Sequence, residues 1–234
     1  MCLSATASFV AGTTLSAVRV ATIRKTERWS ELPLAMIPLL FGVQQIVEGI
    51  LWLTLRHDAP VLQLTTTYVY SVFSHVLWPM YVPFAVGFLE ATRWRKRVLF
   101  AFQGTGLIVG LYLLFFLVTR PVVAQIDGLH IVPHLLYESP HFYLMPVMVL
   151  YLAATCFSCF VSSHPFVKLF GVLALFSFIA SYLYYSRALI SVWCFFAAVL
   201  SLVIYLHLRF RHWGGLSGAD DCCSSHRVIS AATR

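Results

Sequence analysis

One acidic residue, Glu48, lies inside an apolar run, residues 34–55, that carries no other charged side chain. An ionised carboxylate at the centre of a membrane-spanning helix costs about 2.5 to 3.5 kcal/mol, so such a residue usually has a partner or a task. In a helix, Gln44 and Gln45 lie one turn before Glu48 and Trp52 lies one turn after it. A carboxylate with amides beside it can exchange a proton, bind a cation or hold a small polar ligand.

A histidine in the following apolar run is the expected neighbour of this carboxylate. Ser71, His75 and Trp78 have the spacing of one helical face. If the two runs pair as an antiparallel hairpin, residues 44–48 face residues 71–75, and Glu48 is expected to meet His75. A carboxylate bonded to an imidazole can relay protons, orient a base or support a metal ion. The alternative is a buried polar clasp between two helices.

A second group of side chains has the chemistry of metal ligands. Imidazoles and a thiolate bind zinc or copper, and the four-residue spacing of His130 and His134 would suit one helical face. Pro133 weakens that geometry, and residues 127–132 fit extended structure equally well. Loop histidines that are simply solvated are the alternative interpretation. The full set of metal-ligand candidates is Cys2, His57, His130, His134 and His141.

The sixth connection adds a cation and aromatic side chains. Arg187 is the expected contact for a substrate anion, or for Glu48, and Tyr185 lies two residues before it. Tyrosine also favours the membrane interface, so an aromatic belt explains Tyr185 without a ligand.

The elements that must position these residues are membrane-spanning helices. The chain is 60% hydrophobic and only 11% charged, which leaves too little polar surface for a soluble globule. Seven apolar stretches approach the roughly 20 residues that cross a bilayer. They run too uniformly apolar for the strands of a barrel, so the predicted fold is all-α, a seven-helix transmembrane bundle. The predicted spans are 5–23, 34–55, 64–89, 98–119, 142–161, 167–185 and 189–208.

The distribution of basic residues predicts the orientation of this bundle. On a seven-helix path, 13 of the 16 Lys and Arg residues fall on one side, and only Arg56, Arg120 and Arg187 fall on the other. The positive-inside rule then places the N-terminus outside and the C-terminus in the cytoplasm. The positive net charge is explained by topology, so we expect the lipid bilayer as partner and no nucleic acid.

Three further features complete the organisation of residues 1–213 as one membrane domain. Gly106 and Gly110 have the spacing of a close helix-packing face. The CxxC pair Cys156 and Cys159 lies in an apolar helix and is expected to be inert packing. Residues 120–141 form the one long connection, and residues 214–234 are polar and predicted to be a disordered tail.

Three sequence stretches resemble a known family. They are MCLSATASF at residues 1–9, IPLLFGVQQIVEG at 37–49 and SVWCFFAA at 191–198. They are similar to a family of uncharacterised bacterial multi-pass proteins beginning MCxSAxxSF, and the similarity covers nearly the whole chain up to the tail. The resemblance implies a multi-pass protein of the bacterial inner membrane and brings no activity with it.

The leading functional expectation is binding or transport of a small polar ligand, a proton or a metal ion. The site would be an outward-facing pocket around Glu48 and His75, capped by the long connection. A membrane-embedded hydrolase that uses zinc or copper is the first alternative. A structural or assembly subunit without a ligand is the second.

Overall fold

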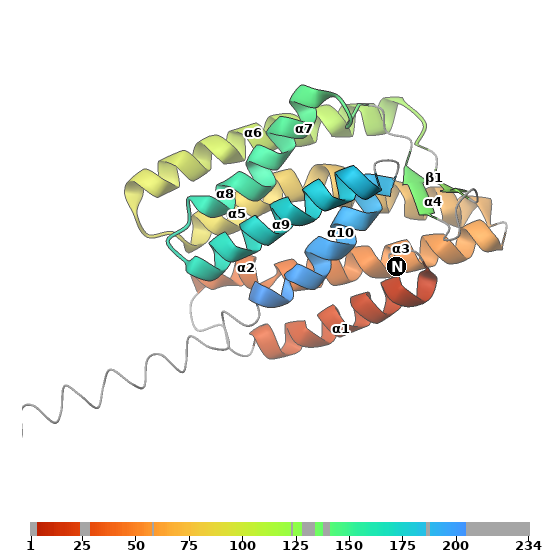
Figure 1. The fold of residues 1–234 in the computed structure, drawn as a ribbon, viewed down its shortest axis with the longest axis horizontal. Helices are drawn as coiled ribbons and strands as arrows, with labels where there is room; N and C mark the ends of the chain where they lie inside the picture. Colours follow the sequence, from red (N-terminus) through yellow and green to blue (C-terminus); the bar gives the residue numbers. More distant parts are fainter. Residues whose placement is uncertain are drawn as a thin grey trace, which may run out of the picture.

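The protein is a bundle of apolar helices that run alternately up and down (Figure 1). The computed structural model describes residues 4–23, 29–57, 59–122, 124–127, 134–137, 141–185 and 188–204. Within them, four helices are long and apolar enough to cross a membrane: Trp29–Arg56, Pro60–Leu89, Arg93–Thr119 and Pro165–Tyr184. Three shorter apolar helices are Ala5–Val18, Met145–Phe160 and Leu189–Ile204. The predicted helical fold is confirmed, and its apolar helices fit a membrane protein.

The first half of the chain forms four of these segments. Their elements are α1 (Ala5–Ile23), η1 (Trp29–Glu31), α2 (Leu32–Ala35), α3 (Ile37–Arg56), α4 (Pro60–Ser71), η2 (Val72–Leu77), α5 (Trp78–Leu89) and α6 (Arg93–Thr119). The helices α1 and α6 lie at opposite edges of the bundle (Figure 1).

The second half begins with a small hairpin and adds three more segments. Its elements are β1 (Ala124–Asp127), β2 (His134–Tyr137), α7 (Met145–Leu152), η3 (Ala153–Phe157), α8 (Ser158–Phe160), α9 (Pro165–Tyr184) and α10 (Leu189–Leu200). The predicted tail, residues 214–234, lies outside the described residues.

The basic cluster at residues 93–97 belongs to a helix, where the sequence predicted a connection before residue 98. The helix α6 begins at Arg93, so the cluster forms its first turns. Arginine and lysine are good helix formers, and their long side chains can extend from a helix end to water. Hydropathy therefore marks the apolar part of a helix and misses its charged end.

The long fourth connection contains two short strands, β1 and β2, whereas residues 128–132, for which extended structure was one interpretation, lie outside the described residues. The strands β1 and β2 pair antiparallel, with Ala124 opposite Tyr137 and Asp127 opposite His134. Gln63 of α4 donates from Nε2 to the carbonyl oxygen of Ala124 at 3.5 Å. The hairpin therefore lies against the beginning of α4, beside the turn that follows α3 (Figure 1).

The predicted glycine packing face is confirmed on α6. A Cβ atom added to Gly106 would lie 1.8 Å from the carbonyl oxygen of Pro79, and one added to Gly110 would lie 2.9 Å from Sδ of Met80. Pro83, inside α5, has no N–H to donate to that Pro79 carbonyl. The backbone of α6 thus approaches α5 at the point where proline interrupts the hydrogen bonds of α5.

A second pair of glycines, which the sequence interpretation did not single out, joins α1 to α3. A Cβ atom on Gly12 would lie 2.7 Å from Cγ1 of Ile46 and 2.9 Å from the carbonyl oxygen of Gly42. Small residues allow two membrane helices to approach closely, and such packing drives their association in lipid. This contact fixes α3, and with it Glu48, against α1.

Two π-helical turns, η2 and η3, interrupt two of the helical segments. Such turns are rare and occur often at functional sites. Pro79 follows η2 closely and has no N–H for a carbonyl of the preceding turn. The hydroxyl of Tyr151, just before η3, donates to the carbonyl oxygen of Ser74 inside η2 at 2.5 Å. The end of α7, just before η3, is therefore bonded to η2.

A buried carboxylate holds together one end of the bundle. Glu90, between α5 and α6, accepts hydrogen bonds from the Ser162 hydroxyl at 2.8 Å and from the Ser163 backbone N–H at 2.6 Å. The Ser163 hydroxyl donates to both carboxylate oxygens, and Nη1 of Arg95 lies 3.9 Å from Oε2. The α5–α6 and α8–α9 connections are thereby tied together.

Candidate functional site

Glu48 is fully buried in α3 and its carboxylate is shared between two helices. The hydroxyl of Ser191, on α10, donates to Oε1. The amide of Gln45 donates from Nε2 to Oε2 at 3.0 Å, which agrees with the predicted placement of this glutamine one turn before Glu48. None of the three side chains has more than 1% of its surface exposed. Each oxygen of the carboxylate thus has one neutral donor.

The second glutamine connects α3 to α5. Oε1 of Gln44 accepts a hydrogen bond from the indole Nε1 of Trp78 at 2.7 Å. That indole is stacked on Phe41, with ring centroids 3.8 Å apart. The thiol of Cys194, on α10, neighbours the side chains of Gln44 and Glu48. Side chains of α3, α5 and α10 therefore surround one polar region in the interior.

His75 belongs to the same interior but does not contact Glu48, so the expected pair is not formed. Its Nδ1 lies 2.8 Å from the Ser74 hydroxyl and 3.2 Å from the Ser71 carbonyl oxygen. The ring meets Phe142 edge-on at 5.2 Å. His75 lies inside the π-helical turn η2, which has more residues per turn than an α-helix. Its side chain therefore does not follow the regular spacing on which the expectation relied.

Several buried polar atoms in this region have no hydrogen-bond partner among the described residues. They are Oε1 of Gln45, Nε1 of Trp52, Oγ of Ser71 and Nε2 of His75. Buried polar groups in proteins almost always have a partner, which is often an ordered water molecule or a ligand. The interior of the bundle therefore has hydrogen-bonding capacity that the described residues do not use.

A small cavity adjoins the polar side chains. It has a volume of about 30 Å³, and the side chains that line it, which include Trp78, Tyr151, Trp193 and Cys194, are mostly apolar. A cavity needs roughly 10 to 15 Å³ to hold one water molecule. The cavity therefore has room for one or two water molecules but offers them few hydrogen-bond partners, and it is too small for a solute of metabolite size.

The expected outward-facing pocket is closed, because Glu48, Gln44 and Gln45 have no exposed surface. The fourth connection nevertheless approaches this end of the bundle, since β1 accepts the hydrogen bond from Gln63. The side chains that contact Glu48 and Gln44 come from α3, α5 and α10, and α9 contributes Phe170 and Ala174 to the cavity beside them.

The candidate metal ligands do not form a cluster in the part of the chain that the structure describes. No group of three or more His, Cys, Asp or Glu side chains in those residues has metal-binding geometry. His57 is exposed beyond the end of α3, and His141 is stacked on Phe116 at 3.6 Å between centroids. His134 lies in β2, so the helical-face geometry expected for it is wrong. Cys2 and His130 lie outside the described residues.

The two remaining candidates are Tyr185 and Arg187, of which the structure describes only Tyr185. Tyr185 follows the last residue of the helix, donates its backbone N–H to the Ser181 carbonyl oxygen at 2.8 Å and keeps 38% of its surface exposed. That position fits the aromatic belt. Arg187 lies outside the described residues. Cys156 and Cys159 of the CxxC pair are free and buried, and they belong to the hydrophobic core.

Sequence reasoning missed the residue that contacts Glu48 most directly. Ser191 was interpreted only as part of the outer end of the last helix. The sequence feature that could have identified Ser191 is its spacing from Cys194. This spacing places two small polar side chains on one face of an otherwise apolar helix. Tyr151 and Ser74 carried no comparable signal, because a tyrosine in an apolar run resembles ordinary packing.

Comparison with known proteins gives the chain a family. No curated protein and no solved structure matches it. One family model matches residues 1–217, and its description is "Family of unknown function". The match covers the described helices and agrees with the resemblance to an uncharacterised family. The chain belongs to this family of unknown function, DUF6629.

Proposed function

We propose that this protein is a seven-span protein of the bacterial inner membrane that conducts protons through its interior, with Glu48 as the group that takes up and releases the proton. The proton is the smallest of the ligands that the sequence suggested. The enclosed site and the small cavity beside it favour this choice over a larger polar solute.

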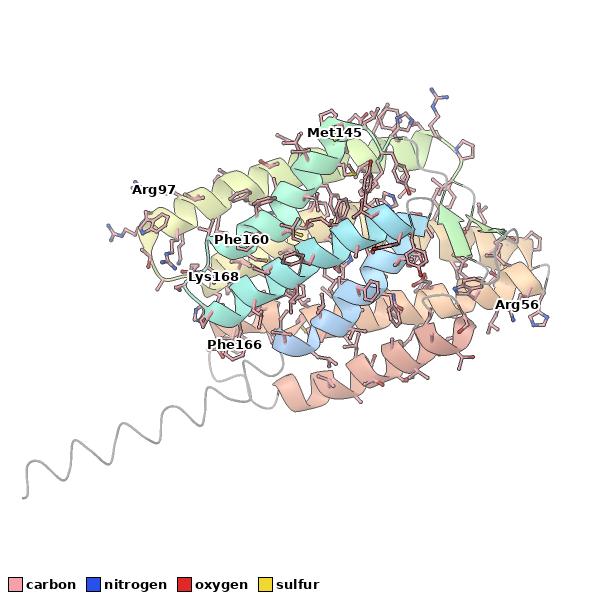
Figure 2. The ribbon with its side chains drawn as sticks, in the orientation of Figure 1. Arg56, Arg97, Met145, Phe160, Phe166 and Lys168 are labelled. Carbon is pink, nitrogen blue, oxygen red and sulfur yellow. The ribbon has the colours of Figure 1, made fainter. Side chains whose placement is uncertain are left out.

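The arrangement of charges supports the membrane topology in this proposal. Arg97 and Lys168 lie at one end of the bundle, and Arg56 lies at the other (Figure 2). The end with Arg97 also carries Arg93, Arg95 and Lys96 in the first turns of α6. By the positive-inside rule this end faces the cytoplasm, and the N-terminus and the hairpin then face outside.

The observation that carries the proposal is a fully buried carboxylate with neutral partners only. In the described part of the chain, no basic side chain lies within 4.0 Å of Glu48. An ionised carboxylate without a counter-ion is costly in a medium of low dielectric constant. Intramembrane carboxylates in such settings mark proton and ion pathways. A proton bound at Glu48 removes that cost, and its release requires solvation of the carboxylate.

The polar atoms around Glu48 can supply that solvation. The unpartnered atoms of Gln45, Trp52 and Ser71 offer both donors and acceptors to bridging water. Water-mediated hydrogen bonds are nearly as strong as direct ones, and chains of them carry protons between side chains. His75 Nε2 is a further proton acceptor in the same interior.

Proton flux into vesicles tests the proposal. The purified full chain is reconstituted in liposomes that contain a pH-sensitive dye, and a potassium diffusion potential drives proton entry. We expect flux above that of protein-free liposomes and its loss in Glu48→Gln. Glu90→Gln is the matched control, because it makes the same change in a buried carboxylate between α5 and α6. Wild-type flux equal to that of protein-free liposomes, or unchanged flux in Glu48→Gln, would contradict the proposal.

A structural clasp is the second candidate, favoured by the hydrogen bond that connects α10 to α3. A structural clasp depends on the hydrogen bond between Ser191 and Glu48 and does not require Glu48 to take up or release a proton. It predicts that wild type has no flux and that Glu48→Gln, which keeps hydrogen-bonding groups, unfolds at the same temperature as wild type. Replacing buried polar groups by apolar ones is often neutral or stabilising, so Glu48→Leu measures how much the clasp contributes.

A further inference from the structure

A groove at the basic end of the bundle is separate from the polar interior. It has a volume of about 470 Å³ and lies between α5 and α6, beside η1. Phe84, Gly87 and Phe88 line it from α5, and Lys96, Phe100 and Gln103 line it from α6. The spacings within each set place the residues on one face of their helix. The groove is thus apolar along its length, with a lysine at its mouth.

The position of the groove corresponds to the level where lipid headgroups meet acyl chains. Lys96 lies in the first turn of α6, and Gln103 is two turns further along, roughly 10 Å away along the axis. Trp29 and Trp94 at the same end have 85% and 58% of their surface exposed. Tryptophan concentrates at the membrane interface, so these two side chains mark the headgroup level.

The apolar part of the groove is continuous with the surface that faces lipid. Phe84, Phe88 and Phe100 are 46%, 50% and 79% exposed, on helices long and apolar enough to span a membrane. A lipid chain that enters the groove therefore lies mainly against apolar side chains. The groove is deepened by Gly87, whose missing side chain leaves its floor open.

The charge at the mouth is available to a ligand. The Glu90 carboxylate nearby is already bonded to Ser162, Ser163 and Arg95. In contrast, no acidic side chain of the described residues lies within 4.0 Å of Lys96. Arg93 lies one turn before Lys96, on a neighbouring side of the helix. An anion at the mouth thus meets Lys96, with Arg93 one helical turn away.

We infer that this groove is a binding site for one anionic phospholipid, with an acyl chain between α5 and α6 and the phosphate at Lys96. The amide of Gln103, at the deep end, can donate a hydrogen bond to an ester carbonyl of the lipid. Each basic residue near an anionic headgroup contributes about 1 kcal/mol, which is roughly a fivefold change in affinity. The apolar groove adds to this electrostatic attraction a preference for a ligand that carries an acyl chain.

Native mass spectrometry of the full chain with added lipid tests the inference. The probes are phosphatidylglycerol and phosphatidylcholine of the same chain length. We expect tighter binding of phosphatidylglycerol and an affinity about fivefold lower in Lys96→Gln. Lys168→Gln, at the same end of the bundle, is the matched control and should bind as wild type does. Equal affinity of the wild type for the two lipids would overturn the inference.

A second variant separates the groove from general surface charge. A Cβ atom at residue 87 would have only Leu99 Cβ nearby, at an ordinary 3.7 Å, so Gly87→Leu fills the groove without displacing a helix. We expect weaker binding of both lipids, with unchanged thermal unfolding of the protein. If Gly87→Leu binds phosphatidylglycerol as wild type does, the attraction is one of surface charge alone and the site does not exist.

Discussion

The hydroxyl of Ser191 donates a hydrogen bond to Oε1 of Glu48, and this bond joins α10 to α3 across 143 residues of sequence. Both side chains have at most 1% of their surface exposed. The last helix therefore controls one of the two donors to the carboxylate, and its position sets how the carboxylate is solvated.

The Ser191→Ala variant should lose this donor and keep the fold. Hydrogen bonds between membrane helices contribute about 0.6 kcal/mol on average and at most about 1.7 kcal/mol, so we expect a loss of about 1 kcal/mol in the free energy of unfolding. Ser177→Ala is the control, because its hydroxyl bonds only to Ala174 of its own helix. Unfolding in mixed micelles measures both variants. An equal loss of unfolding free energy in the two variants would show that the hydrogen bond between α10 and α3 adds no more stability than a bond within one helix.

The contact of Gly106 with Pro79 predicts a large effect of a single methyl group. In Gly106→Ala the new Cβ would lie 1.8 Å from the Pro79 carbonyl oxygen, so α6 must move away from α5. Overpacking costs about 1 to 3 kcal/mol and sometimes more, and a clash with backbone belongs at the upper end. Gly104→Ala is the control, since its Cβ would have no neighbour within 4 Å. It should be neutral or stabilising by up to about 1 kcal/mol. The measurement is thermal unfolding in detergent. Equal melting temperatures of the two variants would contradict this packing of α6 on α5.

The hydrogen bond from α7 to the π-helical turn η2 can be removed by deleting one oxygen atom. Tyr151→Phe deletes the hydroxyl that donates to the Ser74 carbonyl oxygen and leaves that acceptor buried. We expect a cost of about 1 to 3 kcal/mol, the usual penalty for an unsatisfied buried group. Tyr182→Phe, at a side chain 44% exposed, is the control and should change little. Hydrogen exchange of residues 72–77 should also become faster in Tyr151→Phe, and unchanged exchange there would show that the bond does not hold the turn.

Glu90 predicts how stability depends on pH at the basic end. Burial raises the pKa of this carboxyl, but the Ser163 N–H, the Ser162 and Ser163 hydroxyls and the nearby His164 outweigh it, so the pKa is lowered from its ordinary 4.5. A lowered pKa in the folded state means that the stabilisation is complete above the unfolded-state pKa. It is lost as the pH falls through the folded-state value.

Melting temperatures of wild type and Glu90→Gln, measured from about pH 7 down to about pH 3, test this dependence. We expect the variant to be less stable by about 1 to 2 kcal/mol near neutral pH, because a charged acceptor is lost. The difference between the two proteins should shrink as the solution becomes more acidic than about pH 4.5. A difference that stays constant over the range would exclude a role for the ionised carboxylate.

Much of the fold follows from the sequence because its signals are local. The apolar runs, the isolated charge of Glu48 and the spacing of Gly106 and Gly110 each depend on residues within one helix. The membrane makes these signals strong, because the backbone of each spanning helix must form its hydrogen bonds within that helix. The start of α6 was misplaced for the same reason, because hydropathy does not register a charged helix end.

The site was harder to predict because it depends on contacts between distant segments. Glu48 and Gln45 could be paired from spacing alone, but Ser191 is brought to them only by the packing of α10 on α3. The expected contact with His75 failed because nothing in the composition of residues 72–77 signals a π-helical turn. Such a turn changes which side chains face a neighbouring helix, and one residue bonded to it, Tyr151, lies far away in the sequence.

The turn η2 is equivalent to one additional residue inserted into a helix, and it divides the segment into two parts. Because the wider turn absorbs the additional residue, deleting a single residue between 72 and 77 would leave a regular helix whose two parts keep nearly the same relative rotation. Ser71 and Trp78 would then still be oriented toward the same interior. In homologous chains, the loss of one residue within this segment should therefore remove the π-helical turn and leave the packing of the flanking helices unchanged.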